Sequence, residues 1–311
     1  MGKTSIEWTS DTWNPVTGCT KVSQGCKNCY AERVFPRPYP GRKFTDVRMH
    51  EDRLDQPLRW KRPRKIFVNS MSDLFHESIP DRYIAQIFAV MGMATRHTFQ
   101  VLTKRPSRMH SMMTAQYGSD YKAPIEWKSC FLRDVRYWAE KWDWFPPKTI
   151  EENNKRNAFI YCLKTGKEKF KNVHLGVSVE NQETADERIP LLLQTPAAVR
   201  WVSYEPVLGP VNFAPFFSWR PAESKYERRS LDWIVSGGES GPKARPSELD
   251  WYRSVRDQCA AAGVPFFMKQ LGAHPMTRIG ADQAKIPFRI KDRKGGDMEE
   301  WPRDLRIREM P

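Results

Sequence analysis

Three cysteines, Cys19, Cys26 and Cys29, lie within eleven residues near the amino end of the chain. Their spacing, C-x6-C-x2-C, gathers three thiols in one short loop, and three thiolates can hold three irons of a four-iron, four-sulfur (4Fe-4S) cluster. The fourth iron then has no protein ligand and stays open to a substrate or cofactor. Gly18 and Gly25 let the loop curl tightly and point backbone N–H groups at the sulfides. The spacing therefore predicts an iron–sulfur site with one open iron.

Two other interpretations of these cysteines stay open. A zinc site with three cysteines and one histidine could use His50 or His76, although neither lies at the spacing of a zinc finger. Three buried free thiols without a metal are the weaker alternative. A disulfide framework does not fit, because such frameworks spread their cysteines through small secreted chains. The remaining cysteines, Cys130, Cys162 and Cys259, are predicted to be packed thiols, and a second metal site that uses Cys130 and Cys162 stays open.

The composition indicates a sizeable core and a polyanionic partner. Hydrophobic residues make up 40% of the 311 residues and aromatic residues 12%, which excludes a fully disordered chain. The chain has no apolar run of about 18 residues and no signal peptide, so we expect a cytoplasmic protein with no membrane partner. Lys and Arg number 51 and Asp and Glu 37, a net charge of +14, which favours nucleic acid as a partner.

Short β-like runs alternate with helical periodicity along most of the chain. Strands are predicted at 66–70, 99–103, 173–179, 199–204, 233–236 and 264–269. Helices are predicted at 81–95, from 106 to 112, across 185–192 and at 249–262, where Gly263 caps the last helix. Strands that alternate with helices form parallel sheets, and six or seven such units suit a partial or full (β/α) barrel. A doubly wound open sheet is the competing architecture.

Polar residues follow nearly every predicted strand, and this favours the barrel. In a barrel these positions converge on one mouth, where barrel enzymes carry out their chemistry. Charged residues there are candidates to bind substrate, although each taken singly could belong to a structural ion pair. These candidates are Lys104, Arg105, Glu205, Glu239 and Lys269.

Two segments interrupt the alternation. Residues 115–171 form an insertion within a 1–272 barrel domain and are rich in aromatic residues, lysine and arginine. An insertion of this length is predicted to be a lid, a substrate-binding element or a small subdomain. Its aromatic rings suit stacking on bases and its cations suit phosphates, but the rings could equally form the core of a subdomain. Residues 273–311 form a basic C-terminal extension with little periodicity.

The cysteine loop, residues 14–31, resembles the cluster loop of radical SAM enzymes. It departs from that pattern because three extra residues separate Cys19 from Cys26 and because Asn28 replaces the usual aromatic residue. Across nearly its whole length, the chain is similar to a phage and bacterial three-cysteine-motif family of radical-SAM-like proteins. The matching stretches are Ile6–Thr9, Thr12–Pro15, Gly18–Cys19, Gly25–Cys26, Cys29–Ala31, Asn69–Phe75, Leu102–Pro106, Leu175–Glu180, Glu205–Pro206, Gly237–Gly241 and Lys269–Gln270.

The resemblance implies a fold, two cofactors and the cluster ligands. The fold is a (β/α) barrel of radical SAM type, and the cofactors are a 4Fe-4S cluster and S-adenosylmethionine (SAM). Cys19, Cys26 and Cys29 hold the cluster, and an external electron donor of the flavodoxin or ferredoxin type reduces it. Reductive cleavage of SAM then yields a 5′-deoxyadenosyl radical that abstracts a substrate hydrogen. For a phage protein, the location is the host cytoplasm.

The resemblance also implies residues that bind SAM at its adenine and methionine ends. Tyr30 is expected beside the adenine. Ser70, Ser72 and Asp73 stand where such enzymes usually have a glycine-rich stretch that grips the methionine amino group. Asp73 and the serine hydroxyls could accept hydrogen bonds from that ammonium group, whereas Asp73 could equally cap a turn.

Two further pairs of residues are expected near SAM. Ser178 and Glu180 end the strand that touches the ribose or the carboxylate in this fold, and Glu180 suits the ribose hydroxyls. Gly237 and Gly238 could let the backbone approach the adenine or the substrate, or simply form a turn.

We therefore expect a radical SAM enzyme, of isomerase or lyase type, that acts on a nucleic-acid base or nucleotide. Rearrangement of a modified thymidine in phage DNA and repair of a damaged base are the two specific forms, and a duplex base would have to be flipped out. Two alternatives from other classes stay open. One is an iron–sulfur redox or sensor protein without SAM cleavage, and the other is a zinc-stabilised nucleic-acid-binding module.

Overall fold

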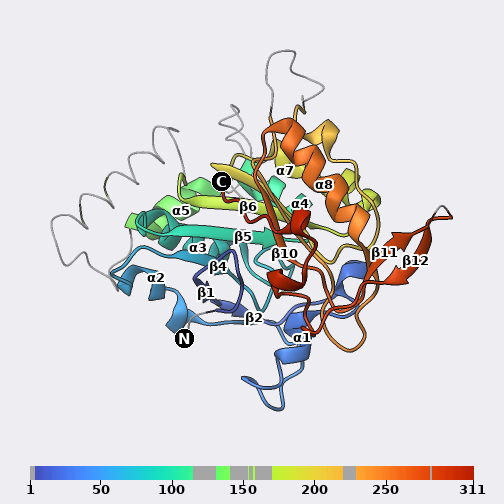
Figure 1. The fold of residues 1–311 in the computed structure, drawn as a ribbon. Helices are drawn as coiled ribbons and strands as arrows, with labels where there is room; N and C mark the ends of the chain where they lie inside the picture. Colours follow the sequence, from blue (N-terminus) through green and yellow to red (C-terminus); the bar gives the residue numbers. More distant parts are fainter. Residues whose placement is uncertain are drawn as a thin grey trace. The chain divides into compact units, whose positions relative to one another are not determined.

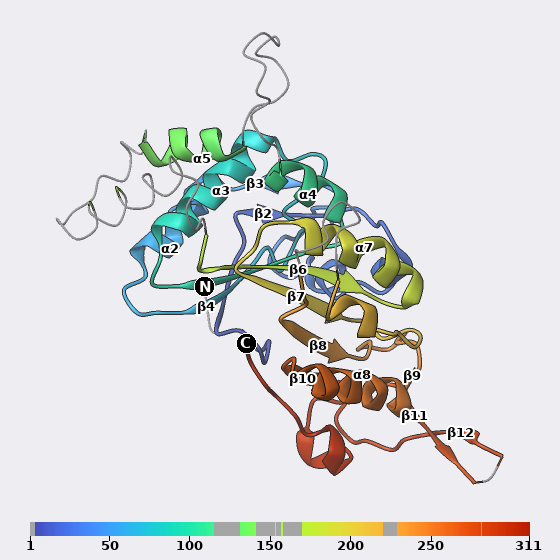
Figure 2. The same ribbon diagram turned by 90° about the horizontal axis from the view of Figure 1, so that it is seen from above.

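A computed structural model describes residues 4–114, 131–140, 153, 157, 170–219, 229–280 and 282–311 (Figures 1 and 2). Backbone contacts divide the chain into two units. The first unit comprises residues 1–20, 41–175 and 195–198, and the second comprises 21–40, 176–194 and 199–311. Cys19 therefore belongs to the first unit, whereas Cys26 and Cys29 belong to the second.

The first unit contains a parallel set of strands covered by helices. Its elements are β1 (Asp11–Trp13), β2 (Val16–Thr17), β3 (Arg48–Met49), η2 (Glu51–Arg53), α2 (Gln56–Arg59), β4 (Lys65–Val68), α3 (Asp81–Met93), β5 (Thr98–Thr103), α4 (Pro106–Thr114) and α5 (Phe131–Glu140). β1 pairs with β4 and β4 pairs with β5, both in parallel. β2 and β3 form a separate antiparallel pair. α3 and α5 lie side by side in both ribbon views (Figures 1 and 2).

α3 illustrates how sequence determines structure in this unit. Pro80 precedes the helix in an extended conformation, and Asp81 places a negative charge in the first turn, where the helix dipole favours it. Ile84, Ile87 and Phe88 recur at helical spacing and are fully buried. The helix predicted at 81–95 is thus confirmed, with its last turn ending at Met93.

The second unit contains the remaining parallel strands and the carboxyl-terminal segment. Its elements are η1 (Gln24–Cys26), α1 (Tyr30–Val34), α7 (Gln182–Gln194), β7 (Val199–Tyr204), η3 (Ala214–Phe216), β8 (Trp233–Gly237), β9 (Ser247–Glu248), α8 (Leu249–Ala262), β10 (Phe266–Gln270), β11 (Pro275–Ile279), β12 (Ala284–Pro287), η4 (Met298–Glu300) and η5 (Arg303–Leu305). β7 pairs with β8 and β8 pairs with β10, both in parallel. Gly263 caps α8 in the left-handed conformation, at φ +65°, as predicted.

The main sheet has seven strands, in the hydrogen-bonded order β1-β4-β5-β6-β7-β8-β10. β6 (Val173–Val179) begins in the first unit and ends in the second. The predicted mixed α/β class with a parallel sheet is therefore confirmed, while the radical SAM type of barrel stays a prediction. Among the described helices, none has both the length and the apolar content of a membrane-spanning segment.

The structure describes little of the insertion predicted at 115–171 but most of the C-terminal extension predicted at 273–311. Of the insertion at 115–171, the structure describes mainly α5, where Val135 and Ala139 are buried and the rings of Tyr137 and Trp138 lie 5.4 Å apart. Cys130, Cys162 and most of the aromatic residues lie outside the described residues. The extension at 273–311 is structured, because β11 and β12 form an antiparallel ribbon and Trp301 is buried.

Candidate functional site

The three clustered cysteines differ from the fourth cysteine that the structure describes. None of the four is in a disulfide, but Cys19, Cys26 and Cys29 are half-buried, whereas Cys259 is fully buried in α8. Burial, with a contribution from Glu309, raises the pKa of the Cys259 thiol to about 12. Cys259 is therefore a packed thiol, as predicted, while the other three are accessible to a ligand.

In the first unit, backbone hydrogen bonds hold Cys19 at the carboxyl end of β4. The amide of Gly18 donates to the carbonyl of Met71 at 3.0 Å, and the amide of Cys19 donates to the carbonyl of Phe44 at 2.8 Å. Gly18 has φ +93°, and a Cβ atom there would lie 2.5 Å from the carbonyl oxygen of Asp46. Only glycine suits this position, so Gly18 determines where the cysteine side chain begins.

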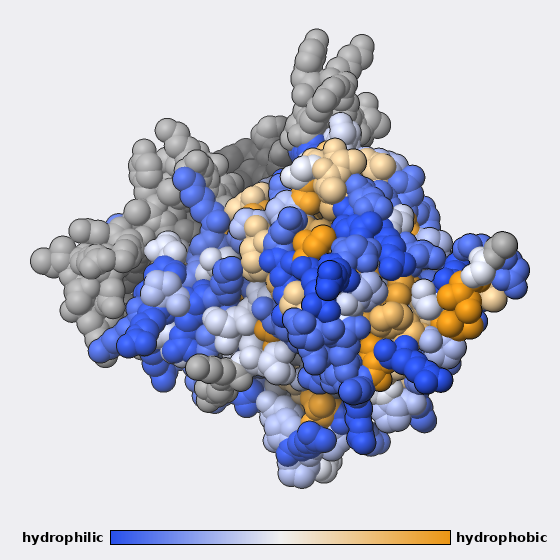
Figure 3. Space-filling view, in the orientation of Figure 1, coloured by the Kyte–Doolittle hydropathy of each residue, from blue (hydrophilic) through white to orange (hydrophobic). Residues whose placement is uncertain are grey.

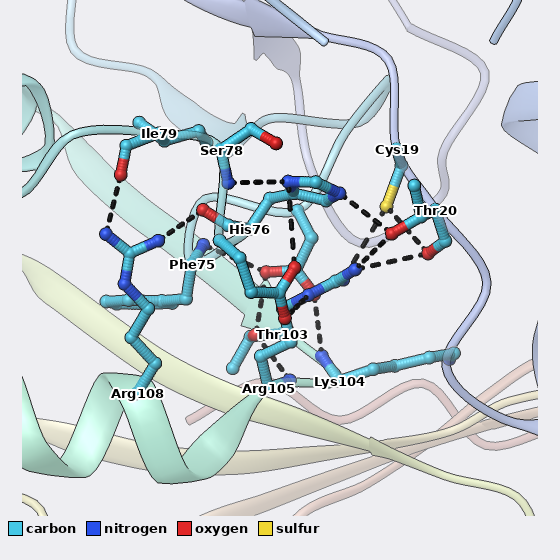
Figure 4. Close-up of polar contacts among 12 residues, drawn as sticks. Cys19, Thr20, Phe75, His76, Ser78, Ile79, Thr103, Lys104, Arg105 and Arg108 are labelled. Atoms are coloured by element: carbon cyan, nitrogen blue, oxygen red, sulfur yellow. Dashed lines mark hydrogen bonds and ion pairs between the residues drawn. The ribbon is translucent and has the colours of Figure 1, made fainter. Parts of the chain in front are cut away.

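Arg105, which follows β5, places a positive charge beside Cys19 (Figure 4). Its Nη1 lies 3.6 Å from Sγ of Cys19 and 3.3 Å from Oδ2 of Asp73, and its Nε donates to Glu77 at 2.8 Å. Burial alone would lower the pKa of the guanidinium, but Asp73, Glu77 and Cys19 raise it above its ordinary value. Arg105 therefore stays charged, and a cation at this distance favours the thiolate form of Cys19.

Asp73 is occupied by protein donors. Its carboxylate accepts hydrogen bonds from the Thr103 hydroxyl at 2.7 Å, the Lys104 amide at 2.9 Å and the Phe75 amide at 3.0 Å, in addition to Arg105. These contacts fit the alternative in which Asp73 caps a turn, here between β4 and β5.

The two serines near Asp73 are also used within the first unit. The Ser70 hydroxyl donates to Oδ1 of Asn14 at 3.2 Å, and the Ser72 hydroxyl donates to the carbonyl of Val16 at 3.0 Å. Both serines thus hold the segment that leads to Cys19.

The two histidines that were alternatives for completing a zinc site each lie beside a threonine hydroxyl. Nε2 of His50 lies 2.8 Å from the Thr17 hydroxyl, and Nε2 of His76 lies 2.8 Å from the Thr20 hydroxyl (Figure 4). Burial and the nearby Arg105 lower the pKa of His76. The sequence offered His50 and His76 as alternatives, and the contact of His76 with Thr20 could not be predicted from spacing.

In the second unit, Glu180 supports the loop that carries Cys26 and Cys29. The Ser23 hydroxyl donates to Oε1 of Glu180 at 3.1 Å, and a Cβ atom on Gly25 would lie 2.6 Å from Cδ of Glu180. Glu180 is fully buried, and Nη1 of Arg188 lies 3.1 Å from its Oε2. The loop backbone therefore rests on a neutralised carboxylate at the end of β6.

Glu239, at the end of β8, holds the same loop between its two cysteines. Asn28 donates to Oε2 of Glu239 at 3.0 Å and to the carbonyl of Lys243 at 2.7 Å. Arg245 pairs with Oε1 at 2.6 Å. Burial would raise the pKa of Glu239, but the hydrogen bonds from Arg245 and Asn28 lower it below the ordinary value. An amide at position 28 thus has a specific partner that an aromatic ring would lack.

Glu205 and Lys269 form a third strand-end pair in this unit. Their Oε1 and Nζ atoms are 2.8 Å apart, and the side chains are 15% and 21% exposed. A Cβ atom on Gly237 would lie 2.5 Å from Oε1 of Glu205, and one on Gly238 would lie 2.7 Å from the carbonyl carbon of Leu271. Glycine is therefore needed at both positions because neighbouring protein groups leave no room for a side chain. The sequence alone did not predict this requirement.

The remaining predicted residues differ in exposure. Tyr30, in the first turn of α1, is 52% exposed, whereas Ser178 is 4% exposed and its carbonyl accepts a hydrogen bond from Arg188. Lys104 is half-buried after β5. Among the described residues, no three His, Cys, Asp or Glu side chains are gathered in the way a metal ion requires.

Comparisons with known proteins give a family but no activity. No curated protein and no solved structure matches the chain. The model of a family described as "Protein of unknown function (DUF5131)" matches residues 3–300. Since that match covers almost the whole sequence, the chain belongs to the DUF5131 family.

Proposed function

We propose that this chain is a radical SAM enzyme in which Cys19, Cys26 and Cys29 hold a 4Fe-4S cluster. The exposure of the three thiols supports this most directly: each is half-buried, whereas the fourth described thiol, Cys259, is fully buried. Thiolates are the ligands of such clusters, and reactive thiols are partly exposed and close to cations. The chemistry of the donor set therefore fits the group. Binding would have to bring the three thiols together, because among the described residues no three such side chains are gathered as a metal requires.

The chain's own residues would charge and position the ligands. Arg105 favours the thiolate of Cys19, and Glu180 and Glu239 fix the loop of Cys26 and Cys29. When bound, such a cluster supplies the electron that splits the sulfonium C–S bond of SAM, and the resulting 5′-deoxyadenosyl radical removes a substrate hydrogen. In the cytoplasm, a flavodoxin or ferredoxin would be the electron donor.

The proposed substrate is a nucleic-acid base or nucleotide. The net charge of +14 supports this class, because phosphates attract an excess of lysine and arginine. Glu205 and Lys269, which are partly exposed at the ends of β7 and β10, are the pair we assign to the substrate. An isomerase acting on a modified thymidine in phage DNA and a lyase acting on a damaged base are the two forms of this proposal.

Anaerobic reconstitution with iron and sulfide tests the proposal. Wild-type protein should bind about four irons per chain and, with dithionite and SAM, release 5′-deoxyadenosine. Cys19→Ala, Cys26→Ala and Cys29→Ala should each lose the release of 5′-deoxyadenosine. Cys259→Ala is the matched control, because it removes a thiol that the proposal does not use, and it should keep both iron and cleavage.

Two results would contradict the proposal. A stable cluster that does not cleave SAM would indicate a redox or sensor protein. Tight, colourless zinc binding with no cluster would indicate a zinc-stabilised module.

A further inference from the structure

The turn that follows β12 presents four cations within six residues. Arg289, Lys291, Arg293 and Lys294 are all exposed. None of them pairs with an acidic side chain among the described residues. By contrast, the two cations on the ribbon itself, Arg278 and Lys285, are both paired with Glu248. With four cations and one acidic residue, Asp292, the turn, residues 289–294, carries a net charge of +3 (4 − 1).

The one acidic residue within the turn is used to shape its backbone. Asp292 accepts hydrogen bonds from the amides of Gly296 at 2.5 Å, Asp297 at 3.2 Å and Lys294 at 3.3 Å. Glu300 accepts from the amides of Lys291 at 2.8 Å and Asp292 at 3.0 Å. Both carboxylates are therefore hydrogen-bonded to the main chain, and neither forms an ion pair with one of the four cationic side chains.

The turn is also attached firmly to the core of its unit. Gly295 has φ +65°, and a Cβ atom there would lie 2.5 Å from the carbonyl oxygen of Gly272. The carbonyl of Gly295 accepts hydrogen bonds from the Leu271 amide at 2.8 Å and from Nε1 of the buried Trp301 at 2.9 Å. Cations on a backbone fixed in this way lose less conformational entropy when they bind a ligand.

We propose that this turn, residues 289–294, is a docking surface for the phosphate backbone of a nucleic acid. Exposed Lys and Arg side chains that form no ion pair are the groups that neutralise backbone phosphates, and such contacts position a protein without reading sequence. The proposal rests on the proposed function only in taking nucleic acid as the substrate class. An anionic membrane is less favoured, because the one apolar residue within the turn, Ile290, is only half-exposed, and a membrane site would need apolar side chains to insert.

The test compares two variants of the full-length chain that carry the same change in net charge. In the turn variant, Arg289, Lys291, Arg293 and Lys294 are each replaced by serine. In the matched control, serine replaces four exposed cations of the first unit that have no acidic partner among the described residues: Lys43, Lys61, Arg62 and Arg82. Circular dichroism melting checks that both variants are folded. Binding to a fluorescent 30-nucleotide DNA, single-stranded and duplex, is measured by anisotropy over a range of KCl concentrations.

The turn variant should lose affinity. The slope of log affinity against log salt should become shallower by up to about 3.6 for duplex DNA, since each of four phosphate contacts contributes about 0.9. The control variant should keep most of the slope. Equal losses in both variants would overturn the proposal, as would a wild-type protein that binds no DNA. Preferential binding to vesicles of phosphatidylglycerol and phosphatidylcholine that depends on the turn would overturn it in favour of a membrane. DNA binding is measured without SAM. A protein that fails to cleave SAM can therefore still give any of these results, and the two failures can be told apart.

Discussion

At the scale of single residues, two buried carboxylates set the course of the loop that carries Cys26 and Cys29. Each is neutralised by an arginine, Glu180 by Arg188 and Glu239 by Arg245. A buried ion pair cannot lose one partner cheaply, because the other charge is then left unpaired in a medium of low polarity. The two carboxylates therefore keep their positions, and the backbone of the cysteine loop has to fit around them. Gly25 shows the consequence, since any larger residue would meet Glu180.

Gly25→Ala is predicted to displace the cysteine loop. The new methyl group would lie 2.6 Å from Cδ of Glu180, a side chain that is fully buried and cannot move aside. Overpacking of this kind costs about 1–3 kcal/mol of unfolding free energy. We expect lower stability in urea and fewer irons per chain after reconstitution.

Gly209→Ala is the control for this prediction. Neither glycine has a positive φ, and a Cβ atom on Gly209 would lie 3.6 Å from Cβ of Asn181, an ordinary contact. This variant should match wild type within about 0.5 kcal/mol in urea and in iron content. If Gly25→Ala behaves like Gly209→Ala, Glu180 does not fix the loop.

At the scale of elements, sequence periodicity predicts the long, buried segments. β6, β7 and α8 have the predicted bounds, and α3 and β5 differ from prediction by one or two residues. Their patterns are strong because each element buries a continuous apolar face. β1 and β9 were not predicted, since strands of three and two residues are too short for a pattern to emerge. β11 and β12 were not predicted either, because nearly all of their residues are partly or fully exposed and they show no continuous apolar run.

The candidate site was predictable as a set of residues but not as a set of contacts. Periodicity placed Glu180 and Glu239 at strand ends, yet Ser23 and Glu180 are 157 positions apart in the chain, and Asn28 and Glu239 are 211 apart. No local pattern carries information over that separation. The partners of Gly237 and Gly238 were missed for the same reason, because the groups that require glycine there come from other strands.

Gly263 offers an element-scale test that isolates backbone conformation. A Cβ atom at this position would have open space around it, so substitution adds only the strain of φ +65°. Gly263→Ala should lower the unfolding free energy by about 1 kcal/mol, and Gly263→Asn by less, since asparagine tolerates the left-handed region. Thermal unfolding monitored by circular dichroism measures both. Equal stability of all three proteins would mean that α8 ends without this cap.

At the scale of the whole molecule, four histidines with a lowered pKa lie in the first unit, whereas carboxylates with a lowered pKa, such as Glu77 in the first unit, occur in both units. His50, His76, His97 and His174 all have a lowered pKa, with burial as the leading cause, and all belong to the first unit. In the second unit the shifted groups include Glu239, Glu248 and Asp304, whose pKa values are lowered by basic partners. Because histidines titrate at higher pH than carboxylates, the buried histidines should lower the free energy of unfolding at milder acidity than the paired carboxylates do.

His174 gives the most specific prediction of a loss of stability in mild acid. Burial, with a contribution from Lys65, lowers its pKa to about 4, whereas an unfolded histidine titrates near 6.5. The unfolded chain therefore binds the proton more readily, so stability is complete above pH 6.5 and falls as the pH drops from there toward 4. The loss attributable to His174 is up to about 3 kcal/mol.

His174→Gln, which never carries a charge, should flatten the decline of unfolding free energy between pH 6.5 and 4, as measured by urea titration at each pH. His274→Gln, in the second unit, is the matched control and should leave the decline as steep as in wild type. A decline of the same steepness in His174→Gln would show that the folded protein accommodates the charged ring. The acid sensitivity of the first unit would then be attributed to its other groups with a lowered pKa, His50, His76, His97 and Glu77, each of which can be replaced in the same way.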